Sequence, residues 1–293
     1  DIRLAKVMSY HVLLLKNPDE SSPDPYQHTL SLKGFTTSIV PTLVHSYTDP
    51  DGLANTILHE GGEYGGVIVT SGRAVDAWEN AVKLVKGRGQ LPVTDGISAW
   101  TSKPFYVVGP KTEQQLLNLG PSKYIPGPEL ILGAKESGTG ELLAKFICTD
   151  YPTRLSHNLP LLYLTGDKNA GGVGKGLQVE GIGFKMVQVY ATSASTTFEQ
   201  DFDKGVKEAA SQSATDTVVV FFAPSSAELA FPVIRKRFSL SSLLEEKPRA
   251  KLVAIGPTTA RAVADNHNVR VDAVSSKPQP EALADAIQHL STL

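Results

Sequence analysis

The chain has 293 residues, and its 41% hydrophobic and 20% charged residues are ordinary for a globular protein of one large or two average domains. Its 28 Lys and Arg nearly balance 30 Asp and Glu, and the formal net charge of −2 provides no basic field for nucleic acid. The single cysteine, Cys148, excludes an internal disulfide, and no apolar run reaches the roughly 18 residues that span a membrane.

The chain begins with a predicted strand–helix–strand unit. A buried strand at 11–16 is followed by a polar loop, a helix at 25–33 and a second strand at 35–40. Gly34 ends the helix, and Pro41 ends the second strand. This order indicates parallel strands joined by a right-handed helical crossover.

The next segment predicts further strand–helix units. A strand at 67–71 leads into an amphipathic helix at 74–85, and a strand at 106–108 leads into a helix at 112–119. Between these two units, residues 87–103 are polar and irregular, which predicts a surface loop. Two more helices are expected, at 51–60 with Asp49 or Asp51 as its N-cap and at 140–149 with Cys148 on its core face.

The second half of the chain repeats two phrases of the first. Val218-Val-Val-Phe-Phe222, followed by Ala223-Pro-Ser-Ser226, corresponds to Val67-Ile-Val-Thr-Ser71. Leu252-Val-Ala-Ile-Gly-Pro-Thr-Thr-Ala-Arg-Ala262 corresponds to Tyr106-Val-Val-Gly-Pro-Lys-Thr112. In each pair a buried strand ends in hydroxyl-bearing residues and runs into a helix, so the chain is interpreted as two related halves.

A third pair is the strand–helix–strand unit itself. Residues 161–190 contain a strand at 161–165, a helix ending near Gly181 or Gly183, and a strand at 184–190, in the same order as 11–40. The remaining elements expected in the second half are a helix at 198–212, a helical or mixed segment at 231–244, a strand at 269–274 and a helix at 280–287.

The shared unit stands first in the first half and last in the second, which has a consequence for topology. Residues 1–40 and 195–293 are expected to form one discontinuous α/β domain, and residues 47–187 a second domain inserted into it. Two extended segments, 41–46 and 188–194, then link the domains. The predicted fold class is therefore α/β, with two flavodoxin-like parallel-sheet domains joined by a two-stranded linker.

Hydroxyl-bearing residues recur where a strand ends and a helix begins. Ser71, Thr112, Ser225 and Thr258 occupy these positions, and Thr259 stands beside the last of them. The first N–H groups of a helix are unpaired and attract anions, and ligands of parallel sheets bind at this edge. The alternative is that the hydroxyls only cap their helices. Four matched copies favour an anion site over caps alone.

Several familiar sites are excluded by spacing. The seven histidines are scattered without an i,i+4 pair, so no metal site is expected. The glycine-rich run at 170–176 lacks the spacing of a phosphate-binding loop, because Leu177 follows Gly176. A Gly-x-Ser-x-Gly nucleophile motif and a dinucleotide motif after a strand are also missing.

Six phrases in a fixed order carry a resemblance to a known family. They span much of the chain and read Thr70-Ser-Gly-Arg-Ala-Val75, Val107-Val-Gly-Pro-Lys-Thr112, Leu164-Thr-Gly-Asp167, Val189-Tyr190, Phe221-Phe-Ala-Pro-Ser225 and Ala254-Ile-Gly-Pro-Thr-Thr-Ala260. The set resembles uroporphyrinogen-III synthase, and Asp24-Pro-Tyr26 and Pro278-Gln-Pro-Glu-Ala-Leu283 fit as well. The resemblance extends over about residues 11 to 290.

The resemblance implies an enzyme that needs no cofactor. Such a lyase expels the terminal hydroxyl of linear hydroxymethylbilane as water and closes the ring with the last pyrrole inverted. The product is uroporphyrinogen III, a precursor of haem and other tetrapyrroles. The substrate carries many carboxylates, which suits helix N-termini in a protein of nearly neutral net charge. The rival reading is a two-domain anion-binding protein without catalysis.

The resemblance also implies roles for individual residues. Tyr190 is the candidate to assist hydroxyl loss, although an interface aromatic without catalytic role remains the alternative. We further expect a cytoplasmic monomer that binds the linear tetrapyrrole, with no metal, nucleic acid or membrane partner. The residues expected to bind substrate are Ser71, Gly109, Lys111, Thr112, Gly166, Asp167, Lys168, Ser225, Ser226, Gly256, Thr258 and Thr259.

Overall fold

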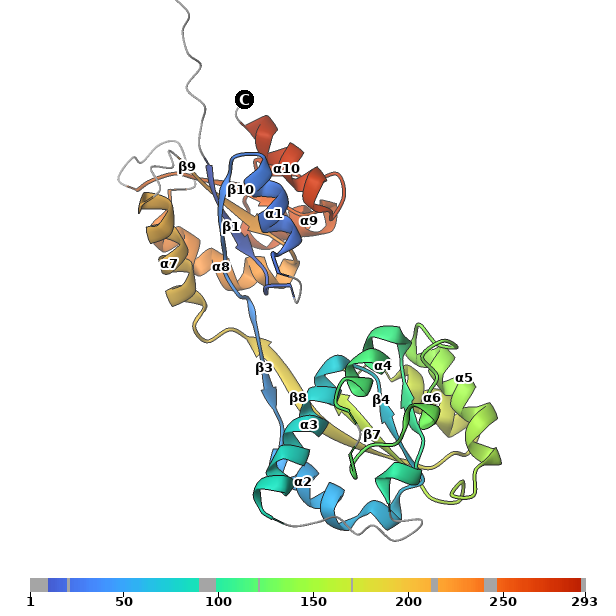
Figure 1. Cartoon of the computed structure of the whole chain (residues 1–293). Helices are drawn as coiled ribbons and strands as arrows, with labels where there is room; N and C mark the ends of the chain where they lie inside the picture. Colours follow the sequence, from blue (N-terminus) through green and yellow to red (C-terminus); the bar gives the residue numbers. More distant parts are fainter. Residues whose placement is uncertain are drawn as a thin grey trace, which may run out of the picture. The chain divides into compact units, whose positions relative to one another are not determined.

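The protein divides into two compact units in the computed structural model, which describes residues 10–19, 22–89, 99–120, 122–169, 171–211, 216–239 and 247–290. The first unit combines residues 1–44 with 193–293, and the second comprises residues 45–192 (Figure 1). The first unit is therefore discontinuous in sequence, and the chain passes between the units twice.

The first unit contains a five-stranded parallel sheet. Its strands, from one edge to the other, are β2 (Thr36–Ile39), β1 (Tyr10–Leu15), β9 (Asp216–Phe221), β10 (Ala250–Ala254) and β11 (Ala273–Val274). Numbered along the chain, this order is 2-1-3-4-5, the flavodoxin-like arrangement. All six residues of β1 are buried, because helices cover both faces of the sheet.

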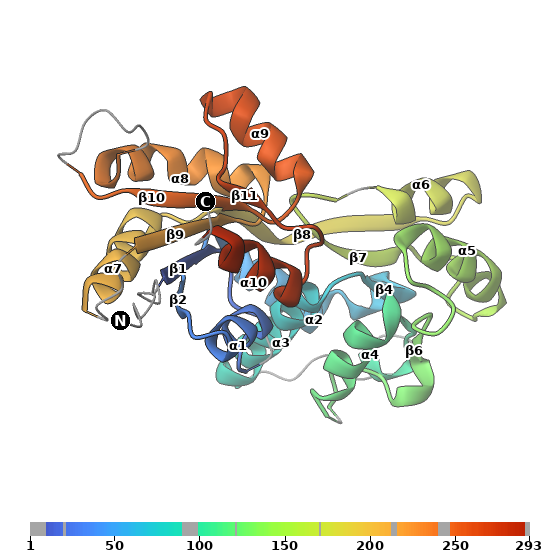
Figure 2. The same cartoon turned by 90° about the horizontal axis from the view of Figure 1, so that it is seen from above.

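Five helices cover the sheet of the first unit. On one face lie α1 (Pro25–Leu32) and α10 (Pro280–His289), and on the other lie α7 (Phe198–Ser211), α8 (Pro224–Arg237) and α9 (Pro257–His267). Figure 2 shows α8 and α9 on one side of the strands and α1 and α10 on the other. Each face has its own apolar core, because successive residues of a strand point to opposite faces. Leu13 and Leu15 pack toward α7 and α8, whereas Val12 and Leu14 pack toward α1 and α10.

The second unit repeats this topology in permuted chain order. Its six strands are, in spatial order, β3 (Leu43–Tyr47), β8 (Phe184–Ala194), β7 (Leu161–Gly166), β4 (Gly66–Val69), β5 (Phe105–Val107) and β6 (Ile131–Leu132). The pairs from β8 to β6 are parallel. When β7 is counted as the first strand, the order is again 2-1-3-4-5, with β3 added at one edge.

The helices of the second unit also divide between two faces. One face carries α2 (Pro50–His59), α3 (Gly72–Gly87) and α4 (Gly109–Leu117), and the other carries α5 (Gly140–Asp150) and α6 (Gly172–Val179). Single 3-10 turns stand at Gly61–Glu63, Trp100–Ser102, Pro128–Leu130 and Tyr151–Thr153. Asp49 caps α2, since its Oδ1 accepts the N–H of Gly52 at 2.9 Å.

The predicted fold class is confirmed by these two sheets. The three sequence pairs occupy equivalent places: β1–α1–β2 corresponds to β7–α6–β8, β9–α8 to β4–α3, and β10–α9 to β5–α4. The second unit is thus a circular permutation of the first. The permutation follows from the place of the shared strand–helix–strand unit. This unit comes first among the elements of the first unit and last among those of the second.

Two local predictions were wrong. The surface loop expected at 87–103 is buried at its end: Trp100 is only 1% exposed, and its indole N–H donates to the carbonyl of Ile57 at 2.7 Å. Lys103 is also buried, its Nζ donates to the carbonyl of Tyr64 at 2.7 Å, and burial lowers its pKa to about 8. Residues 90–98 lie outside the described part of the chain.

The other error concerns element length. The strand expected at 269–274 is reduced to Ala273–Val274 at the sheet edge. The segment at 231–244, predicted to be helical or mixed, continues α8 as far as Arg237 in its described part, although Pro232 stands inside the helix. Residues 240–246 of that segment lie outside the described ranges. The short strand β6 was not predicted, because two apolar residues give no periodicity.

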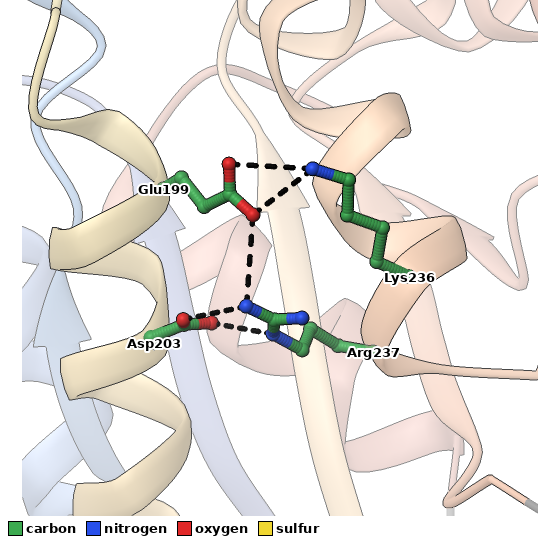
Figure 3. Close-up of polar contacts among 4 residues, drawn as sticks. All are labelled: Glu199, Asp203, Lys236 and Arg237. Atoms are coloured by element: carbon green, nitrogen blue, oxygen red, sulfur yellow. Dashed lines mark hydrogen bonds and ion pairs between the residues drawn. The ribbon is translucent and has the colours of Figure 1, made fainter.

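Charged residues tie α7 to the carboxyl end of α8. Arg237 donates from Nε and Nη2 to the two carboxylate oxygens of Asp203, each at 2.7 Å, and Lys236 Nζ lies 3.1 Å from Glu199 (Figure 3). The hydrogen bond from Arg237 holds the pKa of Asp203 below its usual range. Basic residues at this end of α8 also complement the helix dipole.

Candidate active site in the second unit

A pocket of about 520 Å³ lies at the carboxyl edge of the second unit's sheet. It lies between the ends of β4 and β7, whose following helices, α3 and α6, cover opposite faces of the sheet. This reversal is the topological switch point at which open α/β sheets bind ligands. The lining residues are Thr70, Ser71, Val108, Gly138, Thr139, Gly140, Glu141, Tyr163, Thr165, Gly166, Lys168, Asn169, Gly172, Val173 and Tyr190.

The starts of four helices border this pocket: α3, α4, α5 and α6. Ser71 caps α3 by accepting the N–H of Ala74 at 3.3 Å, and Thr139 caps α5 by accepting the N–H of Leu142 at 3.3 Å. The N-cap of α6 is Gly171, whose φ of +74° suits glycine and which offers no side-chain acceptor. Unpaired N–H groups and helix dipoles therefore favour an anionic ligand here.

Tyr190 brings a phenol to the same pocket from β8. Its hydroxyl oxygen accepts a hydrogen bond from Ser71 Oγ at 3.2 Å. The guanidinium carbon of Arg73, in the first turn of α3, lies 5.9 Å from the centre of the tyrosine ring. Because Ser71 donates to the phenol oxygen, the hydroxyl hydrogen of Tyr190 is available to a ligand.

Two basic residues lie at the site of Tyr190. Lys168 is exposed and lines the pocket, and Arg73 lies over the ring. His45, on β3, is within 3.0 Å of Thr192 Oγ1 through its Nδ1. Partial burial, followed by the charges of Arg73 and Lys168, lowers the pKa of His45 against the opposing effect of Asp167. His45 is therefore neutral at pH 7.

Asn169 adds an unused donor to the pocket wall. Its Oδ1 accepts the N–H of Gly171 at 2.9 Å, and the hydroxyl of Tyr163 lies 3.4 Å from the same oxygen. These contacts fix the orientation of the amide. The buried Nδ2 then has no hydrogen-bond partner among the described residues, and Asn169 is one of the residues that line the pocket. A carboxylate oxygen would satisfy this donor.

The structure brings together four of the residues predicted for the site: Ser71, Gly166, Lys168 and Tyr190. Thr112 is only 7% exposed and does not line the pocket. Gly109 begins α4 with φ of +72°, and Lys111 is exposed in the same first turn. The carboxylate and backbone N–H of Asp167 bond to β8, and the residue is not among those lining the pocket.

The remaining predicted residues belong to the first unit. Ser225 and Thr258 are exposed, whereas Ser226 and Thr259 are buried. Ser226 Oγ bonds to the N–H and the carbonyl of Ala223, so its hydroxyl closes the start of α8. The alternative that the hydroxyls only cap their helices does not hold for α9, since Gly256 is the N-cap and no side chain caps this helix.

The equivalent edge of the first unit is filled by side chains. Lys16, which follows β1, forms an ion pair with Asp24, and its Nζ lies 5.6 Å from the ring centre of Tyr26 and 5.9 Å from that of Phe222. The two rings meet edge to face at 4.9 Å. Tyr26 also donates its hydroxyl hydrogen to the carbonyl of Pro278 at 2.9 Å. These contacts join the loop after β1 to the segment before α10.

Sequence reasoning missed Arg73, Thr139 and Asn169 as members of the site. Arg73 stands inside a quoted phrase, but its position over Tyr190 depends on β8, which is distant in sequence. Thr139 does carry a readable signal, because a hydroxyl residue precedes the apolar run of α5. Asn169 follows a strand in a polar loop, and nothing in its spacing indicates an unpaired amide.

Neither a metal-binding cluster nor a membrane-spanning helix is found within the described ranges. No group of three or more His, Cys, Asp and Glu side chains there could hold a metal ion. No helix there combines the length and apolar character needed to cross a membrane.

The fold and pocket define a two-unit α/β protein whose second unit presents helix N-termini, a tyrosine and basic side chains to an anionic ligand. The family model described as "Uroporphyrinogen-III synthase HemD" matches residues 24–285. The chain belongs to the uroporphyrinogen-III synthase family, and the family predicted from the ordered phrases is confirmed.

Relatives in this family cover nearly the whole chain. Uroporphyrinogen-III synthase of Saccharomyces cerevisiae is 29% identical over 284 residues, and that of Schizosaccharomyces pombe is 28% identical over 276 residues. Each alignment covers 94% of this chain and 95% of the relative.

Solved structures with similar folds include two bacterial proteins of the same name. A mutant uroporphyrinogen III synthase of the extremely thermophilic bacterium Thermus thermophilus is 14% identical with a TM-score of 0.44, and the alignment covers 97% of this chain and 99% of that one. The uroporphyrinogen-III synthetase of Helicobacter pylori is 15% identical with a TM-score of 0.44, covering 96% and 99%.

Proposed function

We propose that this chain converts linear hydroxymethylbilane to uroporphyrinogen III, with loss of water and inversion of the last pyrrole ring. Family membership supports the reaction, and the observation that carries it within the structure is the contact between Ser71 and Tyr190 at the pocket. This contact gives the anion pocket a proton donor, which an anion-binding protein without catalysis does not require.

Tyr190 assists departure of the hydroxyl group in this proposal. The carbon–oxygen bond breaks, the hydroxyl leaves with a proton as water, and the pyrrole nitrogen stabilises the cation that remains. The phenol donates that proton or a hydrogen bond to the leaving oxygen. Ser71 Oγ and the Arg73 guanidinium stabilise negative charge that develops on the phenol oxygen. The proton released on ring closure restores the phenol.

The substrate carboxylates are held by the groups around the pocket. The N-termini of α3, α5 and α6 each contribute about 0.3–1 kcal/mol to binding an anion at an exposed site. Lys168 supplies a full positive charge, and Asn169 Nδ2 supplies an unpaired donor. Exposed residues at helix starts elsewhere offer further anion contacts, and these are Lys111, Ser225 and Thr258. Gly109 and Gly256 leave the backbone N–H groups of α4 and α9 accessible for the same purpose.

The reaction requires no cofactor in this proposal, since positioning the bilane for one ring closure supplies much of the rate. We further propose that the enzyme acts as a cytoplasmic monomer without nucleic acid or membrane partners. The net charge of −2 supports the absence of a nucleic-acid partner. Light scattering on the purified protein tests the monomer.

The deciding experiment is incubation of the purified protein with hydroxymethylbilane, followed by separation of the type I and type III products. Type III product is expected at a rate that a chelator leaves unchanged. If only the type I isomer of unassisted closure forms, while the bilane or a carboxylate analogue still binds, the chain is an anion-binding protein and the proposal is wrong.

A further inference from the structure

Strand β8 contains a bulge next to Tyr190. Along most of its length β8 pairs with β7 residue for residue, ending with Gln188 opposite Thr165. The next residue of β7, Gly166, pairs with Tyr190 and not with Val189. Strand β8 therefore carries one extra residue at this point. In a regular strand Tyr190 would point away from the face used by Val189, because side chains alternate.

The extra residue changes the direction of Tyr190. Val189 is buried in the core that α2 and α3 form with the sheet, and Tyr190 packs against the same core. Neighbouring residues of a strand share a face only where a bulge interrupts the alternation. The bulge therefore brings the phenol to Ser71 at the start of α3, where the pocket lies.

Asp167 binds β8 at this tyrosine and just beyond it. The backbone N–H of Asp167 donates to the carbonyl of Tyr190 at 3.2 Å. Its Oδ1 accepts the N–H of Thr192 at 3.0 Å. Strand β7 ends at Gly166, so the carboxylate takes the place of the next backbone carbonyl in the ladder. One residue thus binds the chain at Tyr190 and again two residues later.

Gly166 completes the arrangement. A Cβ at this position would lie 2.4 Å from Cε2 and Cζ of Tyr190, so the ring occupies space that any other residue would fill. The aromatic ring, the bulge and the two hydrogen bonds of Asp167 form one local unit. Its components lie next to one another in the sequence phrase Leu164-Thr-Gly-Asp167 and in β8.

We infer that Asp167 is a positioning residue, which keeps the bulge of β8 and thereby directs Tyr190 at the pocket, and that it does not bind substrate. The inference rests on the proposed role of Tyr190. A carboxylate is a poor partner for a substrate made of carboxylates, and Oδ1 is already committed to Thr192. Asp167 acts through its acceptor oxygen and not through attraction of the ligand.

Two substitutions of Asp167 separate these roles. Asp167→Asn keeps an oxygen acceptor for the Thr192 N–H, so we expect kcat within about threefold of the parent. Asp167→Ala removes the acceptor, and we expect kcat to fall at least about tenfold while KM changes by less than about twofold. Glu180→Ala removes an exposed acidic side chain from the same unit and serves as the matched control, with both constants unchanged.

A double substitution provides the sharpest test. In the Tyr190→Phe background, Asp167→Ala should cause no further loss of kcat, because the group that it positions has been removed. A rise in KM with unchanged kcat, equal losses for Asn and Ala, or a fully additive double variant would overturn the inference. If Asp167→Ala does not fold, Asp167→Asn decides alone: a folded variant that loses kcat tenfold contradicts the role of the acceptor.

A spectroscopic measurement keeps the inference independent of the proposed reaction. The nine tyrosines can be labelled with ¹³C at Cζ, and the Tyr190 signal is assigned by its absence in Tyr190→Phe. Asp167→Ala should shift this signal, whereas Asp167→Asn should leave it in place. If the parent protein forms no type III product but the Tyr190 signal follows this pattern, the proposed reaction is wrong and the positioning role of Asp167 remains supported. An unshifted signal in Asp167→Ala refutes the positioning role.

Discussion

The two units share one topology but differ at the switch point of the sheet. In the second unit this edge is a pocket bounded by Gly166, Gly172 and the starts of four helices. In the first unit the same edge is occupied by Lys16, Asp24 and two aromatic rings. The topology therefore creates an edge with exposed backbone groups twice. The residues that follow each first strand decide whether the space between the first and third strands of the sheet is open or filled.

Side-chain size after the first strand explains the difference. Lys16 follows β1 and lies across Tyr26 and Phe222, with only 14% of its side chain exposed. The equivalent strand, β7, ends in Gly166, which leaves room for the Tyr190 ring and for the pocket beside it. A largely buried ion pair occupies the first edge, whereas the second contains an unpaired donor, Asn169 Nδ2.

Among the substitutions that compare the two edges, Tyr190→Phe should have the largest effect on activity. Loss of the phenol hydroxyl removes the proposed proton donor, and we expect kcat to fall about 10²-fold or more with the fold intact. Steady-state rates of type III formation measure the change. Tyr26→Phe removes a hydroxyl from the filled edge and should leave kcat unchanged. A Tyr190→Phe rate within about twofold of the parent would assign Tyr190 a structural role only.

Thr139→Asp places a negative charge at the start of α5 in the open pocket. Aspartate is itself a good N-cap, so α5 should be retained. Repulsion of the substrate carboxylates should raise KM about tenfold, equivalent to about 1.4 kcal/mol. The same kinetic assay, with circular dichroism as the folding control, measures this. An unchanged KM would show that the start of α5 does not contact substrate.

The first unit can be tested in the same way at Thr258, which is exposed at the start of α9. Thr258→Ala keeps the backbone donors, so substrate binding should weaken by about 1 kcal/mol at most. Thr258→Asp adds charge and should weaken binding further. If Thr258→Asp binds and turns over substrate as well as Thr258→Ala, the helix start in the first unit plays no part in substrate binding.

Asp24→Asn should affect stability at the filled edge. Burial alone would raise the pKa of Asp24, but hydrogen bonds from Lys16 and the backbone N–H of Asp19 outweigh it and hold the pKa below its usual value. The resulting stability is fully present above the unfolded pKa of about 3.9 and is lost as the pH falls through the folded pKa. Asp24→Asn should cost about 1 kcal/mol at pH 7.

Thermal unfolding between pH 7 and pH 3 checks this prediction. The parent should lose stability more steeply than Asp24→Asn below about pH 4. Parallel curves would mean that the ion pair contributes nothing to the pH dependence.

Arg237→Gln should have the smallest effect. The Arg237–Asp203 pair is at the surface, where such pairs contribute little and are screened by salt. We expect Tm to fall by at most about 3 °C at low salt and by less at 1 M salt. A larger fall that persists at high salt would indicate that the contact between α7 and α8 depends on this pair.

Much of the fold could be predicted from the sequence because the patterns that indicate its strands and helices are local. Buried strands such as 218–222 and 252–255 show unbroken apolar runs, and paired phrases place them in equivalent positions of two sheets. The burial of Trp100 was not readable, since its partners Ile57 and Trp78 come from other elements. The length of the last strand also depends on tertiary pairing.

The site could be predicted only in part, because several of its contacts join residues that are distant in sequence. Ser71 and Gly166 follow strands, and the sheet topology brings such positions to one edge. Thr112 occupies an equivalent position in its phrase, yet its side chain turns into the protein and is buried. The contacts of Arg73 and Asn169 with the pocket depend on side-chain directions that no sequence period encodes.

The circular permutation of the second unit affects how its two chain ends join the first unit. Its first and last residues, His45 and Thr192, are joined by a hydrogen bond of 3.0 Å. In the first unit, the carbonyl of Thr42 accepts the N–H of Ser195 at 3.0 Å. Each junction therefore has its two chain ends side by side. For the first unit, the insertion behaves as a short hairpin loop would, because the folded insert shortens the effective loop and its closure entropy.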